Sequence, residues 1–291
     1  MEIIGIVKGI NTSDGLNNLI VLDKMQNRYN IKTSLNAFKI GYVYVFQVVQ
    51  VNKDRVSFDL VNYQNSSDLD LSIQDEILRC FYAQSPITIH ELMTKVYEYI
   101  DKIDSKCIKD ITKYLVDKQK REYFTFPAAT RMHHAYVGGL AYHSLGMLKV
   151  ADGFLKNYTY LKKDYLYAGV ILHDIGKTYE LTGVEETEYT IDGQLLGHLI
   201  IGALEINKAA NKLGYDDSSE VKALEHMLIS HHGQPQFGAA KRPQTPEAIA
   251  LWYIDTIDSK FRALGEELQR TPSGTFTDTI GVLDKTKVYK E

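Results

Sequence analysis

Cysteine is scarce in this chain, whose 291 residues include only Cys80 and Cys107. Two cysteines cannot form a disulfide framework or a cysteine-rich zinc site, so a reducing compartment is the simpler expectation. Long apolar runs are also missing, because no segment approaches the roughly 18 residues that a membrane-spanning helix needs. The first seven residues lack the basic region of a signal peptide. We therefore expect a soluble, cytoplasmic protein with no membrane partner.

An excess of positive charge is absent as well, since 33 basic residues face 37 acidic ones and the net charge is −4. This balance excludes a protein held on nucleic acid by bulk positive charge, so any polyanion would be bound locally. Hydrophobic residues make up 44% of the chain. That is enough for a sizeable core, and the length suits one large or two modest domains.

The first 63 residues are predicted to form five short strands. The strands are rich in Val, Ile, Tyr and Phe, and turn-forming segments separate them. They are expected over residues 3–10, 18–22, 28–32, 42–51 and 55–63. This pattern indicates a small β-barrel of the OB type, which often binds single-stranded nucleic acid, while an SH3-like docking barrel remains an alternative.

The rest of the chain changes to a helical period after a polar linker at 65–70. Thr88 and Glu91 form a capping box for the helix that follows them. Further helices are expected over roughly 106–118, 137–157, 164–174, 197–213, 218–232 and 246–266. The prediction is an α+β multidomain protein, with a barrel over 1–63, a linker and connecting helices over 64–130, and an all-α bundle over 131–291.

A basic run lies within the connecting helices, where residues 102–121 hold seven basic side chains against three aspartates. Such a local excess could guide a polyanion. A charge run on a helix is more often a solvated face, and we favour that interpretation.

Eight of the nine histidines fall between His133 and His232. Several lie on apolar helix faces: His143 shares a face with Leu140 and Met147, and an almost wholly apolar segment runs directly into His173 and Asp174. A buried imidazole or carboxylate needs a partner because its unpaired burial costs several kcal/mol. One cation, or a cluster of cations, would partner several such groups at once.

The order of His143, His173-Asp174 and Asp255 resembles the HD-domain metal-dependent phosphohydrolases, which are all-helical. The surrounding segments resemble the YhaM-type 3′→5′ exoribonucleases more specifically. These segments are HHAYVGGLAYHS at 133–144, LHDIGK at 172–177, GH at 197–198, HMLISHHG at 226–233 and IDTIDSK at 254–260. The resemblance implies an OB-type domain before the HD domain and hydrolysis of RNA from its 3′ end.

Seven residues in these motifs are candidate metal ligands. They are His143, His173, Asp174, His198, His231, His232 and Asp255. Because the set holds no thiolate, it argues against closed structural zinc, whereas imidazole and carboxylate suit Mn²⁺, Fe²⁺, Co²⁺ or catalytic Zn²⁺. Mg²⁺ is a further candidate. Seven ligands are too many for one tetrahedral ion and suit two ions. The resemblance implies Mn²⁺.

The related bimetallic HD enzymes imply a division of these ligands, with Asp174 bridging two ions. One site would hold His143, His173 and Asp255, and the other His198, His231 and His232. Simpler members of the superfamily hold one ion with His143, His173, Asp174 and Asp255. Two ions roughly 3.5–4 Å apart would lower the pKa of a shared water and bind the phosphate oxygens.

Further residues are assigned to the substrate. Lys177 is expected to reach a phosphate oxygen and to act as a catalytic point charge. Arg131, His133 and His134 precede the first ligand helix and are expected to line the mouth of the site. His226 is expected to be structural, and Asp258 either orients a ligand or pairs with Lys260.

Three classes of function remain open at this point. The leading hypothesis is a metal-dependent 3′→5′ exoribonuclease that converts single-stranded RNA into nucleoside 5′-monophosphates through a metal-activated hydroxide, with single-stranded DNA as a further substrate. The second is an HD-domain phosphohydrolase of nucleotides or cyclic dinucleotides, and the third is a regulatory binding protein with a structural metal. The predicted barrel favours the first, because a mononucleotide enzyme has no need of a strand-binding module. A homo-oligomer is compatible with each of them.

Overall fold

The computed structural model describes residues 1–51, 57–128, 136–185 and 187–291. The N-terminal part is a closed barrel in the order β1-β2-β3-β5-β4, in which β3 and β5 are parallel and the other pairs are antiparallel. Its strands are β1 (Glu2–Ser13), β2 (Leu16–Leu22), β3 (Arg28–Thr33), β4 (Val43–Gln50) and β5 (Ser57–Asn65). The predicted five-stranded barrel is confirmed, and its topology is consistent with an OB-fold.

The barrel closes because alternate residues of its strands are apolar and point inward. Leu19 and Val21 of β2, Ile31 of β3 and Phe46 of β4 are fully buried. A two-residue turn joins β1 to β2, and Asp14 and Gly15 both have positive φ there, as a type I′ hairpin requires.

The helical part begins directly after the barrel. Its helices are α1 (Leu71–Leu78), α2 (Ile89–Asp101), α3 (Lys106–Lys118), α4 (Lys120–Thr125), α5 (Gly139–Asn157), α6 (Lys163–Leu172), α7 (Lys177–Glu180), α8 (Ile191–Leu213), α9 (Ser219–Ser230) and α10 (Pro246–Arg270). Sequence periodicity predicts seven of these, while α1, α4 and α7 were missed. The Thr88 hydroxyl accepts a hydrogen bond from the amide of Glu91 (3.1 Å), so the predicted cap of α2 is present.

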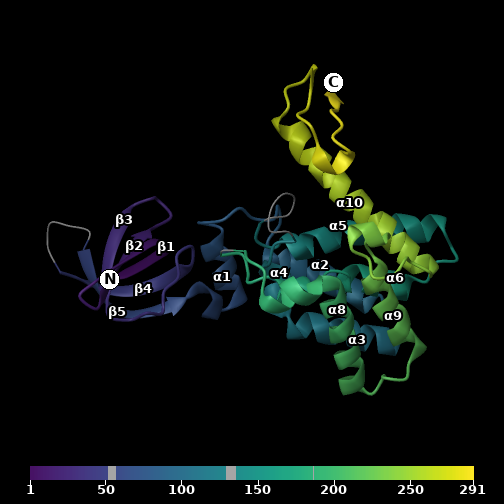
Figure 1. Cartoon of the computed structure of the whole chain (residues 1–291), viewed down its shortest axis with the longest axis horizontal. Coiled ribbons are helices and arrows are strands. Elements are labelled where there is room, and N and C mark those ends of the chain that lie inside the picture. The colour runs from purple at the N-terminus through teal and green to yellow at the C-terminus, as the bar shows by residue number, and fades with distance from the viewer. Residues whose placement is uncertain (52–56, 129–135, 186) are drawn as a thin grey trace.

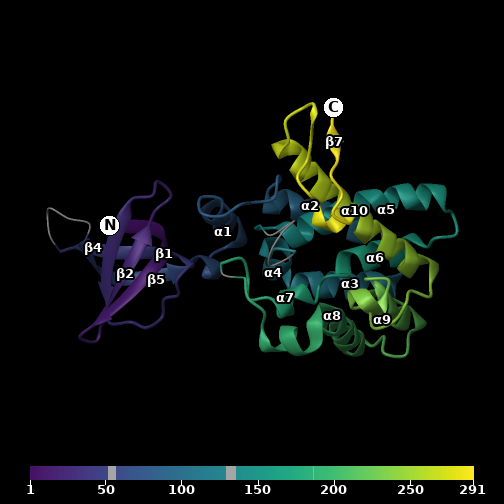
Figure 2. The ribbon, with the colours of Figure 1, turned by 45° about the horizontal axis from the view of Figure 1, so that its top comes forward.

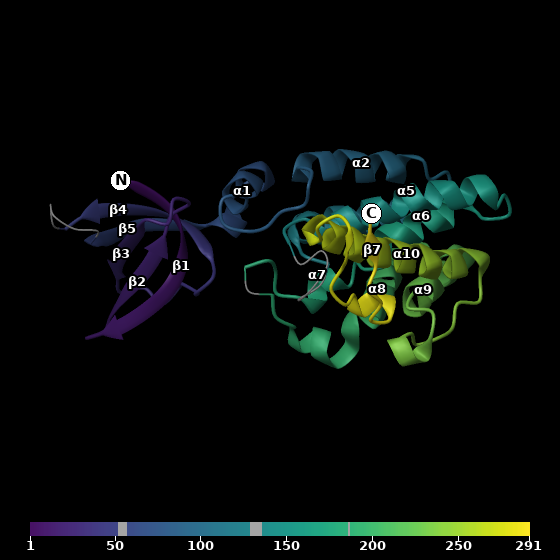
Figure 3. The same cartoon turned by 90° about the horizontal axis from the view of Figure 1, so that it is seen from above.

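The connecting helices share one hydrophobic core with the C-terminal bundle. Leu92 of α2, Ile108 of α3 and Tyr123 of α4 are buried in the same cluster as the apolar face of α6. Figure 3 shows α2 and α5 along one side of the bundle and α8 and α9 along the other. Beyond the bundle, the end of α10 and the short hairpin of β6 (Thr275–Phe276) and β7 (Tyr289–Lys290) project outward (Figures 1 and 2).

The barrel is attached to the bundle by buried polar contacts at the expected linker. Residues 66–68 form the short helix η1 (Ser66–Asp68) rather than a free linker, and Ser66 is fully buried. The carboxylate of Glu185, in the loop before α8, accepts hydrogen bonds from the Val43 amide (2.9 Å) and the Ser66 hydroxyl (3.0 Å). Tyr82 also donates to the carbonyl of Gly41. Figure 1 shows the barrel beside α1, at one end of the bundle.

Most cations of the basic run have partners. Lys106 and Lys113 pair with aspartates one turn further along α3, and Lys118 binds Glu205 of α8. Arg121 donates to Gln74 and to the carbonyl of Leu69. These contacts support a solvated and structural face over a polyanion track.

Among the described residues, no helix combines the length and the apolar character that crossing a membrane would require.

The Glu185 junction makes a testable prediction about stability. Burial raises the pKa of Glu185 above its ordinary value of 4.5, so between the unfolded and folded pKa values the folded protein binds more protons at this group than the unfolded chain does. Stability from this group is therefore present at low pH and is lost as the pH rises. Glu185→Gln keeps an accepting oxygen without the buried charge. The variant should therefore have a higher melting temperature than the wild type at pH 8, by roughly 2–4 °C for each kcal/mol of relief.

The same gain should shrink as the pH approaches 4.5. Scanning calorimetry of both proteins at several pH values measures it. A melting-temperature difference that does not change with pH would contradict the assignment.

Candidate metal centre

The candidate ligands come from five separate segments of the bundle. His143 lies on α5, His173 and Asp174 directly follow α6, and His198 lies on α8. His231 and His232 follow α9, and Asp255 lies on α10. The apolar α6 runs through the core, so the polar pair at its end emerges inside the bundle, where His173 and Asp174 are 0% and 3% exposed.

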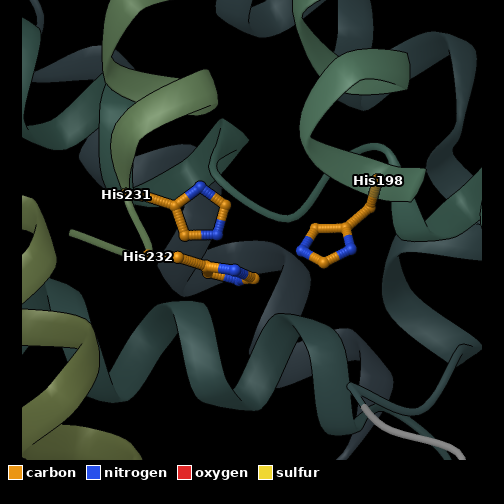
Figure 4. A group of neighbouring side chains, drawn as sticks. All are labelled: His198, His231 and His232. Atoms are coloured by element: carbon orange, nitrogen blue, oxygen red, sulfur yellow. The ribbon is translucent and has the colours of Figure 1, made fainter. Parts of the chain in front are cut away.

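The structure brings these seven side chains together in two groups of three around Asp174. His143, His173 and Asp255 form one group. His198, His231 and His232 form the other, which Figure 4 shows. Within each group the candidate ligand atoms lie within 4.8 Å of one another. This is the same division that the resemblance implied.

Asp174 faces both groups. Its Oδ2 lies 3.1 Å from His173 Nε2, while its Oδ1 lies 3.3 Å from His198 Nε2 and 3.8 Å from His231 Nε2. One carboxylate therefore offers an oxygen to each group, as a bridging ligand would.

Backbone carbonyls hold three of the imidazole rings. The Nδ1 atoms of His173, His231 and His232 lie 2.7–2.8 Å from the carbonyls of Val170, Leu228 and Phe237. Because a carbonyl only accepts hydrogen bonds, each Nδ1 carries the proton. When a ring held in this way is neutral, its Nε2 lone pair is free for a metal.

Carboxylates hold the remaining two rings. His143 Nδ1 lies 2.9 Å from Asp258 Oδ2, and its Nε2 lies 3.1 Å from Asp255 Oδ1. His198 Nδ1 lies 3.1 Å from Glu180 Oε2. Asp258 was expected either to orient a ligand or to pair with Lys260, and the structure shows its contact with the candidate ligand His143. Asp258 also lies 3.4 Å from Arg262 Nε.

The electrostatics of the centre keep its carboxylates ionised. Burial alone would raise the pKa of Asp174, but His173 and Lys177 hold it well below its usual value. The Lys177 ammonium lies 2.7 Å from Asp174 Oδ2 and donates to the carbonyl of Ala128. Burial and neighbouring histidines lower the pKa of His231 and His232, which favours the neutral, ligating form.

Three buried atoms at this point have no hydrogen-bond partner among the described residues. They are His173 Nε2, Asp174 Oδ1 and His198 Nε2. Leaving such atoms unpaired is costly, and here they converge from two segments, the end of α6 and α8. Their chemistry, two imidazole nitrogens and one carboxylate oxygen, fits a divalent metal ion.

Three predicted residues, Arg131, His133 and His134, lie outside the described residues. His226 lies apart from the two groups, and its Nε2 accepts the Gln244 amide at 2.9 Å, which agrees with a structural role. Sequence reasoning missed Glu180. It belongs to no recognised motif, and its contact with His198 depends on the path of α8.

Comparison with known proteins places the chain in a family. The HD domain family matches residues 140–260. Relatives named 3′-5′ exoribonuclease YhaM are similar over most of the chain. The protein of Bacillus licheniformis is 44% identical over 210 residues, or 72% of this chain and 67% of the relative. The chain belongs to the YhaM family of 3′-5′ exoribonucleases.

Two further YhaM proteins show similar agreement. That of Bacillus subtilis is 42% identical over 72% of this chain and 67% of the relative. That of a Geobacillus species is 39% identical over 81% of this chain and 75% of the relative. No solved structure matches.

The geometry predicts an unusual titration in this YhaM family member. Burial opposes the charge on His143, but hydrogen bonds to Asp255 and Asp258 outweigh that effect and raise its pKa to about 9. In the metal-free protein, the His143 ring should therefore stay protonated at pH 7.5, and ¹⁵N imidazole shifts measured by NMR follow this. Assignment uses His143→Gln, whose spectrum lacks the signal. A midpoint near 6.5 would contradict the assigned pair of carboxylate contacts.

Proposed function

We propose that this chain is a metal-dependent 3′→5′ exoribonuclease that degrades single-stranded RNA to nucleoside 5′-monophosphates. The observation that carries the proposal is the pair of three-ligand groups around the buried Asp174, in a chain of the YhaM family. Single-stranded DNA is a second substrate to be tested.

His143, His173 and Asp255 would hold one divalent ion, and His198, His231 and His232 a second, with Asp174 shared between them. Mn²⁺ is the first candidate, and the same donors suit Fe²⁺, Co²⁺ or Zn²⁺, whereas Mg²⁺, the remaining candidate, prefers oxygen ligands. When bound, such ions supply Lewis acidity, which lowers the pKa of water and neutralises charge on a phosphodiester.

The surrounding residues prepare the ligands for this role. Asp174 stays ionised despite its burial because His173 and Lys177 lie beside it. Asp258 keeps the Nδ1 of His143 engaged, so the opposite nitrogen faces the centre. Lys177 places a positive charge next to Asp174, where it can stabilise the negative charge that develops on the phosphate oxygens.

Hydrolysis joins the oxygen of water to phosphorus and breaks the bond to the 3′-oxygen of the preceding nucleotide. A proton returns to that 3′-oxygen, and the released product carries a 5′-phosphate. Cleavage from the 3′ end therefore leaves a strand with a new 3′-hydroxyl, ready for the next cycle.

The barrel would bind the strand mainly through charge. Arg28 and Lys32 are exposed and four residues apart on β3, so they project from the same face. The outward positions of β2 and β3 hold Leu16, Asn18, Ile20, Leu22, Arg28, Asn30 and Lys32, with no aromatic side chain. Contacts with RNA on this face would therefore be electrostatic rather than stacking.

The decisive assay uses 5′-labelled single-stranded RNA, Mn²⁺ and the purified full-length chain. Progressive shortening from the 3′ end is expected. Asp174→Ala should lower the rate at least 1,000-fold, because both ligand groups lose their common carboxylate, while the helical circular-dichroism signal remains. Intact RNA together with turnover of a nucleotide or cyclic dinucleotide would show a small-molecule phosphohydrolase instead. A DNA oligonucleotide of the same sequence tests the second substrate.

The role of the barrel is tested by the double variant Arg28→Ala and Lys32→Ala. Each lost phosphate contact should reduce the slope of log K against log salt by about 0.7 for a single strand. RNA binding followed by fluorescence anisotropy at several salt concentrations measures this slope. Hydrolysis of a small phosphodiester serves as the control and should not change. An unaltered salt slope would exclude this face from binding.

A further inference from the structure

Glu180 ends α7 with a buried side chain, only 7% exposed. Its Oε1 accepts a hydrogen bond from the backbone amide of His198 (3.1 Å) and lies 3.2 Å from His198 Nδ1, and its Oε2 lies 3.1 Å from the same nitrogen. One carboxylate therefore engages both the main chain and the ring of a candidate metal ligand.

A break in α8 makes this double contact available. Gly197 has φ +72° and ψ +158° inside the helix, a conformation that strongly favours glycine. A continuous helix would direct the amide of His198 along its own axis to the carbonyl four residues earlier. At the break, that amide turns to Glu180 instead.

Close packing keeps Glu180 and His198 in place from both sides. A Cβ atom on Gly193 would lie 2.4 Å from the carbonyl oxygen of Glu180, and one on Gly176 would lie 2.1 Å from that of His198. Both positions therefore require glycine. The position of Glu180 is set by the backbone as well as by its contact with the ring.

The two ligand groups differ in charge, and Glu180 lies behind the group that has no carboxylate of its own. The first group contains the carboxylate of Asp255, whereas the second consists of three imidazoles. Carbonyls hold the Nδ1 atoms of His231 and His232, so His198 is the member of its group whose Nδ1 lies against a carboxylate. A carboxylate behind an imidazole fixes its tautomer and strengthens it as a ligand.

We infer that Glu180 is the positioning residue of the second metal group. Its place directs His198 Nε2 toward Asp174, and its charge compensates for the lack of a carboxylate among the three histidines. Loss of Glu180 should weaken binding of one ion and leave the other intact. This inference rests on the proposed two-ion function.

The test measures metal binding directly. Metal-free full-length protein is titrated with Mn²⁺, and free Mn²⁺ is followed by electron paramagnetic resonance, so that two bound ions are expected for the wild type. Glu180→Ala removes contact and charge and should raise the dissociation constant of one ion up to about 100-fold. Glu180→Gln keeps an oxygen that can accept from the backbone amide and the Nδ1 of His198, so a smaller increase of about 10-fold in that dissociation constant is expected.

Glu205→Gln provides the matched control. Glu205 is also buried but pairs with Lys118 and Lys208, away from the two groups. The Glu205→Gln variant should bind two Mn²⁺ ions with the same affinities as the wild type. Melting curves of the metal-free variants show whether each one is folded. If Glu180→Ala is unfolded, the Mn²⁺ titration of Glu180→Gln tests the inference.

If a folded Glu180→Ala or Glu180→Gln variant bound both ions as tightly as the wild type does, the inference about Glu180 would be overturned. The proposed function would stand as long as the wild type degrades RNA. A wild type that neither binds Mn²⁺ nor shortens RNA would instead overturn the proposed function. Selective weakening of one ion in both variants supports the role of Glu180.

Discussion

Asp174 is the point on which the rest of the structure depends, because a carboxylate this deeply buried requires positive charge or hydrogen-bond donors around it. Its two oxygens face histidines from three different segments, and the ammonium of Lys177 lies against one of them. The bundle satisfies this requirement only if α6, α8 and α9 end or bend at the same place. The burial of Asp174 therefore constrains both the packing of these helices and the set of side chains at the centre.

The five imidazoles share a second constraint. Every Nδ1 has an oxygen beside it, so every Nε2 is directed inward. Three of those oxygens are backbone carbonyls, which arise from helix ends and one loop. The other two belong to Asp258 and Glu180, one for each ligand group. This arrangement prepares ligand atoms before any ion binds, which reduces the cost of assembling the site.

The barrel is joined to the bundle by apolar and polar contacts rather than by a flexible tether. Ile6 and Val43 of the barrel belong to the core of the bundle, and Glu185 joins both parts. A strand bound on the barrel would therefore lie at a defined place relative to the bundle. This suits an enzyme that takes one nucleotide after another from a long substrate.

Local sequence determined much of this protein. Alternating apolar residues predicted the five strands, and helical periodicity predicted the long helices, because each of these signals acts within a few residues. The motifs around His143, His173 and Asp255 pointed to candidate ligands that the structure brings together. Short helices such as α1 and α4 were missed because they are too brief for a periodic pattern. The contact of Glu180 with His198 was missed for a different reason. It joins two elements across a break at Gly197, and only the tertiary packing of α7 against α8 brings that carboxylate to that ring.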